Sequence, residues 1–289
     1  MKFKLVTLAS LVFLSSSSLL QGCAGETQTT TDTPPSTANA TTNGDSGTLT
    51  FHVNGEDFVR QGFTTKDGWN VTFDNLYVHL TDVTAYQTDP PYDAYSGSKP
   101  DAKETVLLVE SLSVDLAEGD ESAEPLLVSE VQAPVGQYNA LSWTMKPAEE
   151  GPAQGYALVI IGQAEKDDKA IDFTIKFDET LAFTCGEFVG DERKGILEAQ
   201  GTADLEATFH FDHLFGDGSA PPDDEINTGA LGFDPLAVLA ENNRVEVDLT
   251  TLSEQLSPED YEILKTLLPG LGHVGEGHCH ESMMAHQEE

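Results

Sequence analysis

Apolar and polar residues alternate along most of the chain after residue 48, and this period of two is typical of strands with one face on a core. Leu49, Phe51 and Val53 form the first such run, with polar residues between them. Similar runs lie at 70–86, 112–116, 141–145, 181–185, 205–213 and 245–249. We therefore expect a mainly β protein with about nine strands, arranged as an antiparallel β-sandwich.

Turn signals predict how some of these runs connect. The runs at 156–164 and 171–177 flank a polar sequence at 166–169, which predicts a β-hairpin. Within 70–86 the apolar residues change phase at Asp74 and Asn75, which predicts a β-bulge at that point.

Two segments carry helix signals instead. Ser257 precedes a proline and two acids, so it can cap a helix whose negative charges lie near the positive end of the helix dipole. This short C-terminal helix should end before Pro269. Residues 235–241 predict a second, shorter helix with Asp234 as its cap.

The N-terminal segment is typical of a secretory signal peptide. Lys2 and Lys4 precede an apolar run at 5–14 that is too short to span a membrane and remain there. The segment ends in Leu-Gln-Gly-Cys at 20–23, which resembles the lipobox of bacterial lipoproteins. The resemblance implies that residues 1–22 are removed and that Cys23 becomes a lipidated N-terminus. Ala24 differs from the Asp associated with inner-membrane retention, so the lipobox resemblance implies attachment to the outer membrane of a bacterial cell envelope.

The rest of the chain divides by composition. Residues 23–47 hold the lipidated Cys and a linker rich in Thr, Ser and Pro, which we expect to be disordered because it has no large apolar residue. We expect the β-sandwich domain at 48–270 and a His-rich, metal-binding tail at 271–289.

The charge of the chain excludes one class of partner. Its 289 residues include 50 Asp and Glu against 14 Lys and Arg, which gives a formal net charge of −36. Such a field repels nucleic acids and anionic lipid headgroups, so we expect no nucleic-acid partner and a membrane contact through the lipid anchor alone. The field attracts cations, although most of these carboxylates are expected to form a solvated surface.

Two longer segments resemble a known family. FDNLYVHLTDV at 73–83 and PVGQYNAL at 134–141 are similar to segments of the MbnP-like family of copper-associated periplasmic proteins. That family has a strand that ends in an Asp-Val or Asp-Ile pair, followed by a Pro-x-Gly-x-Tyr turn into the next strand. An uncharacterised group of β-sandwich lipoproteins is the other family that fits. Because these motifs are largely structural, the resemblance implies the β-sandwich fold and does not by itself show a copper site.

The histidines concentrate near the C-terminus, whereas the familiar catalytic signatures are absent from the sequence. Four of the eight, His273, His278, His280 and His286, lie in the last 17 residues. Glu276 and Cys279 lie between them, and closely spaced glycines would let donors at different positions converge on one ion. Imidazole and thiolate suit Zn and Cu, so this segment is a candidate transition-metal site; a polar tail without a ligand is the alternative.

A second group of candidate ligands lies at His210, Asp212 and His213. On the strand expected at 205–213, His210 and Asp212 share one face and His213 falls at the strand end. We expect this group to complete the tail site, with a plain solvated face as the alternative. His52 and His79 each lie alone on the polar phase of a strand and are expected to be ordinary half-exposed residues.

Two cysteines remain once Cys23 is acylated, and we expect a Cys185–Cys279 disulfide because an even pair in an oxidising compartment usually bridges. A Cys279 turned toward Cys185 would leave His278 and His280 together on the other side of an extended segment. His273 and His210 or His213 could then complete a nitrogen-rich site for Zn²⁺ or Cu²⁺, whereas a free Cys279 would shift the preference toward Zn²⁺ or Cu⁺.

The function hypothesis is a non-catalytic, envelope-anchored lipoprotein that captures or buffers Zn or Cu. Two alternatives stay open. One is a structural or adhesive surface lipoprotein that needs no metal. The other is a metal-dependent hydrolase with Glu276 as the general base, which would require an open coordination position.

We expect Cys23→Ser to release the protein from membranes, because the mature chain offers neither a spanning helix nor a basic surface. Fractionation of cells that express the variant, followed by a high-salt wash of the membranes, measures this. Retention of the washed variant in the membrane fraction would contradict the lipobox interpretation.

Overall fold

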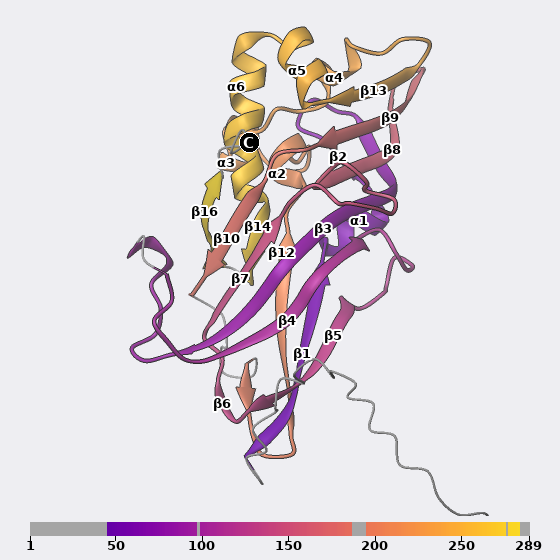
Figure 1. The fold of residues 1–289 in the computed structure, drawn as a ribbon. Helices are drawn as coiled ribbons and strands as arrows, with labels where there is room; N and C mark the ends of the chain where they lie inside the picture. Colours follow the sequence, from indigo (N-terminus) through magenta and orange to yellow (C-terminus); the bar gives the residue numbers. More distant parts are fainter. Residues whose placement is uncertain (1–44, 97–98, 187–194, 276, 284–289) are drawn as a thin grey trace, which may run out of the picture. The chain divides into compact units, whose positions relative to one another are not determined.

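Strands dominate the regular structure, as the alternating pattern predicts. The computed structural model describes residues 45–96, 99–186, 195–275 and 277–283, and the predicted signal peptide and Cys23 lie outside these ranges. Within the described residues, the strands form three sheets of five, nine and two strands. The protein is therefore mainly β (Figure 1).

The five-stranded sheet has the order β15-β14-β12-β1-β5. Its strands are β1 (Ser46–Asn54), β5 (Leu126–Pro134), β12 (Thr202–Phe209), β14 (Gly272–Val274) and β15 (Gly277–His278). β1 and β12 run parallel, so the expectation of a purely antiparallel fold is wrong at this pair. About 150 residues separate these two strands, so no hairpin constrains their relative direction. The nine-stranded sheet also contains one parallel pair, between β9 and β13.

The nine-stranded sheet contains most of the predicted strands. Its members are β2 (Phe63–Thr64), β3 (Asn70–Thr88), β4 (Ala102–Asp115), β7 (Ala140–Met145), β8 (Leu158–Lys166), β9 (Lys169–Phe177), β10 (Leu181–Cys185), β13 (Arg244–Asp248) and β16 (His280–Met283). The predicted hairpin is confirmed, with Lys166 opposite Lys169. The predicted bulge is also confirmed, as a register shift between Phe73 and Asn75. The small third sheet pairs β6 (Gly136–Gln137) with β11 (Ile196–Leu197).

The inward-facing residues of both large sheets belong to one hydrophobic core. Trp143 of β7 stacks on Phe183 of β10 at 5.1 Å and meets Phe209 of β12 edge-on at 6.1 Å. Each aromatic side chain of this size contributes about 1.5–3 kcal/mol when it leaves water. The contact between Trp143 and Phe209 therefore ties the nine-stranded sheet to the five-stranded one.

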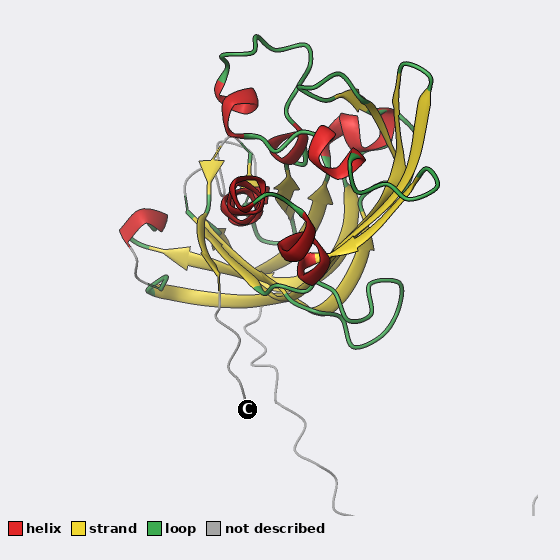
Figure 2. Ribbon diagram, turned by 90° about the horizontal axis from the view of Figure 1, so that it is seen from above, coloured by secondary structure: helices red, strands yellow, loops and turns green. Residues whose placement is uncertain are grey.

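Six short α-helices accompany the sheets in the described part of the chain. They are α1 (Glu56–Gln61), α2 (Asp212–Phe215), α3 (Glu225–Gly229), α4 (Asp234–Ala237), α5 (Leu249–Gln255) and α6 (Pro258–Leu267), with 3₁₀ turns η1 (Ala94–Ser96) and η2 (Leu268–Leu271). None of them has both the length and the apolar character needed to cross a bilayer. In the view of Figure 2 the strands curve around several of the helices, which lie on their concave side.

The predicted C-terminal helix is confirmed as α6, where the Ser257 hydroxyl accepts a hydrogen bond from the N–H of Asp260 at 3.1 Å. The cap predicted for α4 is wrong. The Asp67 carboxylate accepts the N–H groups of Phe233 and Asp234 at 2.8 and 2.5 Å. The Asp234 side chain instead accepts a hydrogen bond from the Trp69 indole at 2.7 Å. A tertiary contact has therefore replaced the local cap.

The strand predicted at 205–213 is too long, because β12 ends at Phe209 and α2 begins at Asp212. Three buried residues, Phe211, Leu214 and Phe215, follow one another at intervals of three and one. This spacing suits one face of a helix rather than a strand. The chain therefore turns after Phe209, and the side chains of 210–213 no longer alternate across a sheet.

The side chain of Asp248 stabilises the start of α5. Its carboxylate caps α5 by accepting from the N–H and hydroxyl of Thr251 at 2.8 and 2.7 Å. The hydrogen bonds from Thr251 hold the pKa of Asp248 below its ordinary value. Asp248→Ala should lower the free energy of unfolding at pH 7 by about 1 kcal/mol, whereas Asp248→Asn, which still caps, should cost less.

Because the folded-state pKa of Asp248 is depressed, its contribution is complete above the unfolded value of about 4 and is lost as the pH falls through the folded value. The difference in unfolding free energy between the parent and Asp248→Asn should therefore shrink as the pH falls from about 5 to 2. Urea unfolding at several pH values measures it. A difference that does not change over this range would contradict the assigned role of the carboxylate.

Candidate metal centre

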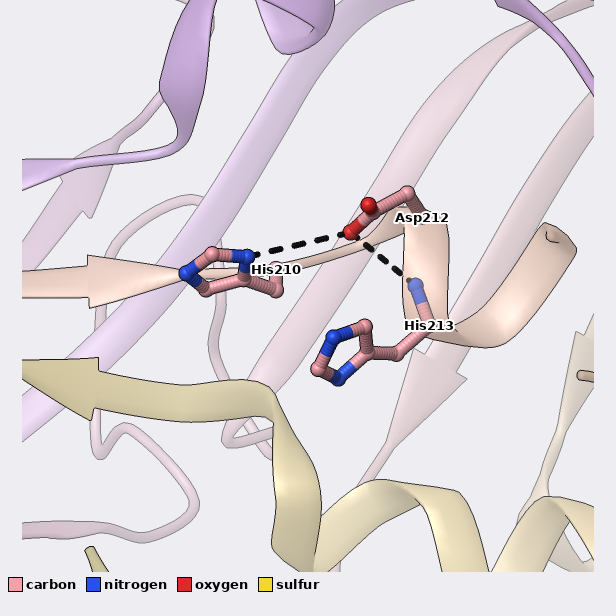
Figure 3. A group of neighbouring side chains, drawn as sticks. All are labelled: His210, Asp212 and His213. Carbon is pink, nitrogen blue, oxygen red and sulfur yellow. Dashed lines mark hydrogen bonds and ion pairs between the residues drawn. The ribbon is translucent and has the colours of Figure 1, made fainter. Parts of the chain in front are cut away.

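The end of β12 brings the second group of predicted ligands together. The N–H of His210 donates to the carbonyl of Leu271 at 3.0 Å, and the carboxylate of Asp212 accepts the N–H of His213 at 3.1 Å. One donor atom from each of His210, Asp212 and His213 lies within 4.8 Å of the other two. Figure 3 shows the two imidazoles and the carboxylate turned toward a common space.

His273 adds a third imidazole to this group from the far end of the sequence. β14 pairs with the end of β12, where Thr208 lies opposite His273. The His273 ring centroid lies 4.4 Å from that of His210 and 5.2 Å from that of His213, and the His210 and His213 centroids are 5.2 Å apart. His273 is buried, with 4% of its surface exposed. Three imidazoles therefore converge in a partly shielded position.

One backbone carbonyl orients two of these rings. The oxygen of Gly270 lies 3.2 Å from Nδ1 of His213 and 3.0 Å from Nε2 of His273. A carbonyl can only accept, so each of these nitrogens donates its proton, and in a neutral ring the other nitrogen carries the lone pair. Nε2 of His213 and Nδ1 of His273 are therefore the nitrogens suited to a metal ion. Histidines that bind metal ions commonly donate the N–H of their other ring nitrogen to a backbone carbonyl in this way.

Two carboxylates accompany the imidazoles. Oδ1 of Asp212 lies 4.0 Å from Nδ1 of His210, and Oε1 of Glu56 lies 3.6 Å from Nε2 of the same ring. Sequence reasoning missed Glu56, because it lies 154 positions before His210 and no local pattern marks it. Zn²⁺ and Cu²⁺ both bind imidazole nitrogens together with carboxylate oxygens.

The structure separates the predicted tail ligands. His278 lies opposite His273 in the backbone register between β14 and β15, and its side chain is not described. His280 lies in β16 of the nine-stranded sheet, opposite Thr184, and is exposed. β15 and β16 thus belong to different sheets, with Cys279 between them. Glu276 lies outside the described residues.

Cys185 and Cys279 form a disulfide, as expected from the sequence. Both are buried, and their Cα atoms are 4.3 Å apart. The bond joins the end of β10 to the residue between β15 and β16. It therefore leaves no Cys279 thiolate for a metal ion.

His79 departs from its expected half-exposed state, since only 7% of its surface is exposed. Its Nδ1 lies 2.9 Å from the hydroxyl of Ser113, and its Nε2 lies 3.2 Å from that of Ser111. Burial lowers the pKa of His79 below its ordinary value. The residue is therefore a hydrogen-bonded, neutral imidazole. His52 is half-buried, in agreement with the expectation.

No protein-family model, no curated protein and no solved structure matches this chain. The resemblance to MbnP-like proteins therefore stays a prediction.

Removal of the disulfide tests how the chain after β14 is held. Cys185→Ser/Cys279→Ser should lower the free energy of unfolding by about 2–5 kcal/mol, because the bond closes a loop of 94 residues in the unfolded chain. Urea unfolding of both proteins measures the change. Alkylation of the unfolded, unreduced parent should modify neither cysteine, and modification of both would rule the bond out.

Proposed function

We propose that this protein is a non-catalytic metal-binding lipoprotein of the bacterial cell envelope, which captures or buffers Zn or Cu. The observation that carries the proposal is the convergence of His210, His213 and His273 within 4.4–5.2 Å, ring to ring, beside Asp212. Chance clusters of exposed acids are common on protein surfaces, whereas this group has three imidazoles, of which one is buried and two donate to the carbonyl of Gly270. The lipobox resemblance at 20–23 supports the lipid anchor and the outer membrane as the location.

The ligands in this proposal are His210, Asp212 and His213, whose donor atoms lie within 4.8 Å of one another, together with His273, whose ring lies beside theirs. His278 is a further candidate, because the backbone register sets it opposite His273. His280 is not a ligand in this arrangement, since it is exposed in the other sheet. The centre of the site therefore moves from the tail itself to the end of β12, where the tail docks.

We also propose that the two large sheets pack as a β-sandwich with the short helix α6 near its C-terminus. The contact of Trp143 with Phe209 supports this arrangement, because these residues belong to different sheets. Gly272 supports it as well, since a Cβ at this position of β14 would lie only 2.8 Å from Phe183 of β10. Close approach of the sheets at Gly272 would hold His273 next to the core.

Metal titration of the purified full-length protein tests the proposed function. We expect one Zn²⁺ or Cu²⁺ per chain, and at least about a 100-fold loss of affinity in His210→Ala/His213→Ala, because each variant position removes a direct ligand. His273→Ala should lose affinity in the same way. His280→Ala and His52→Ala are matched controls that should bind like the parent.

Saturating metal should raise the unfolding free energy of the parent by about 2.7 kcal/mol at a free concentration 100 times the Kd, but not that of His210→Ala/His213→Ala. Equal affinity of the parent and all variants would mean that this cluster is not the site. The structural or adhesive function would then replace the proposal.

A further inference from the structure

Glu56 is a carboxylate next to the candidate metal centre, although it is far in sequence from both segments that supply the histidines. It is the first residue of α1, directly after β1, and its Oε1 lies 3.6 Å from Nε2 of His210. About a third of the Glu56 side chain, 35%, is exposed, and 19% of the His210 side chain is. The contact is too long for a hydrogen bond and is electrostatic.

The backbone of Glu56 adopts an unusual conformation for its residue type. Its φ angle is +62°, in the left-handed region that side chains with a Cβ avoid. The side chain of Asn54 accepts the N–H of Glu56 at 2.9 Å, and Gly55 packs closely on Val59. Such conformations persist where the surroundings over-determine them, and they concentrate at functional sites. The residue with this uncommon φ is thus the one whose carboxylate lies 3.6 Å from His210.

The negative charge of the cluster favours a divalent ion over Cu⁺. Asp212 and Glu56 carry two negative charges beside three imidazoles, which must be neutral to bind a metal. A divalent ion neutralises this set, whereas Cu⁺ leaves a net negative charge in a partly shielded position. Cu⁺ also favours thiolate and thioether sulfur, and Cys279 is held in the disulfide.

We propose that Glu56 is a positioning residue that makes this site selective for a divalent ion, Zn²⁺ or Cu²⁺, over Cu⁺. The inference rests on the proposed function and deepens it. The carboxylate favours the proton on Nε2 of His210, so that Nδ1, on the side of Asp212, carries the lone pair for the metal. Its negative charge adds to the attraction for a divalent ion more than for a monovalent one.

The test compares Zn²⁺, Cu²⁺ and, without oxygen, Cu⁺ binding by the full-length parent and by Glu56→Gln. The parent should bind both divalent ions more tightly than Cu⁺. Glu56→Gln should lower the affinity for Zn²⁺ and Cu²⁺ by about 10–100-fold, the usual effect of losing an outer partner of a histidine ligand, and that for Cu⁺ by less than about 3-fold. Damage to the fold alone would weaken the binding of all three ions together.

Glu56→Gly separates the role in binding from a role in stability. Glycine accepts a positive φ without strain, so this variant should lose divalent affinity while its melting temperature does not fall. Asp167→Gly is the matched control: Asp167 is an exposed carboxylate with a φ of +54° in the turn between β8 and β9. It should likewise keep its melting temperature, and its metal affinity should equal that of the parent.

The outcomes distinguish this inference from the proposed function. A parent protein that binds none of the three ions overturns the proposed function and, with it, the role of Glu56. A parent that binds metal but prefers Cu⁺ overturns the inference alone. So does a Glu56→Gln variant whose affinities are unchanged or fall equally for all three ions.

Discussion

The short pairing between β12 and β14 is the contact on which the candidate metal centre depends. It aligns Thr208 with His273 and Phe209 with Gly272, so the third imidazole arrives beside the two that follow β12. The N–H of His210 extends the same pairing by one step, because it donates to the carbonyl of Leu271. Backbone hydrogen bonds of this kind fix the register, and a slip by one residue would turn His273 to the opposite face.

The residues around this pairing hold it from several directions. Gly272 has no Cβ, which allows β14 to approach Phe183 and Trp143 of the other sheet. Downstream, the disulfide ties Cys279 to the end of β10. Upstream, α6 and η2 deliver Gly270, whose carbonyl orients His213 and His273. The arrangement of the candidate ligands therefore depends on the packing of the core around β12 and β14.

Two of the many carboxylates of this acidic chain lie next to one histidine of the candidate site. A net charge of −36 raises the concentration of cations near the whole surface but selects no particular ion. Glu56 and Asp212 approach one histidine from opposite ring nitrogens, which costs electrostatic repulsion between the carboxylates. A bound cation would offset that repulsion, so the proposed function gives a physical reason for placing these charges together.

The sequence by itself determined the features that depend on near neighbours. The alternation at 49–53, the bulge after Phe73, the hairpin at 166–169 and the Ser257 cap follow from local periodicity and local hydrogen bonding. The disulfide followed from the count of cysteines. His210, Asp212, His213 and His273 were also recognisable as candidate ligands by type.

Only the tertiary structure decided which candidates meet. The parallel pairing of β1 with β12 and the missed strand β5 depend on contacts between distant segments, which leave no periodic trace in the sequence. The helix α5 was also missed, although its Asp248 cap is local. The turn to α2 overrode the strand predicted to His213, because Leu214 and Phe215 had to reach the core. Glu56 enters the site for the same reason: β1 lies beside β12, and proximity of this kind is set by sheet order rather than by sequence distance.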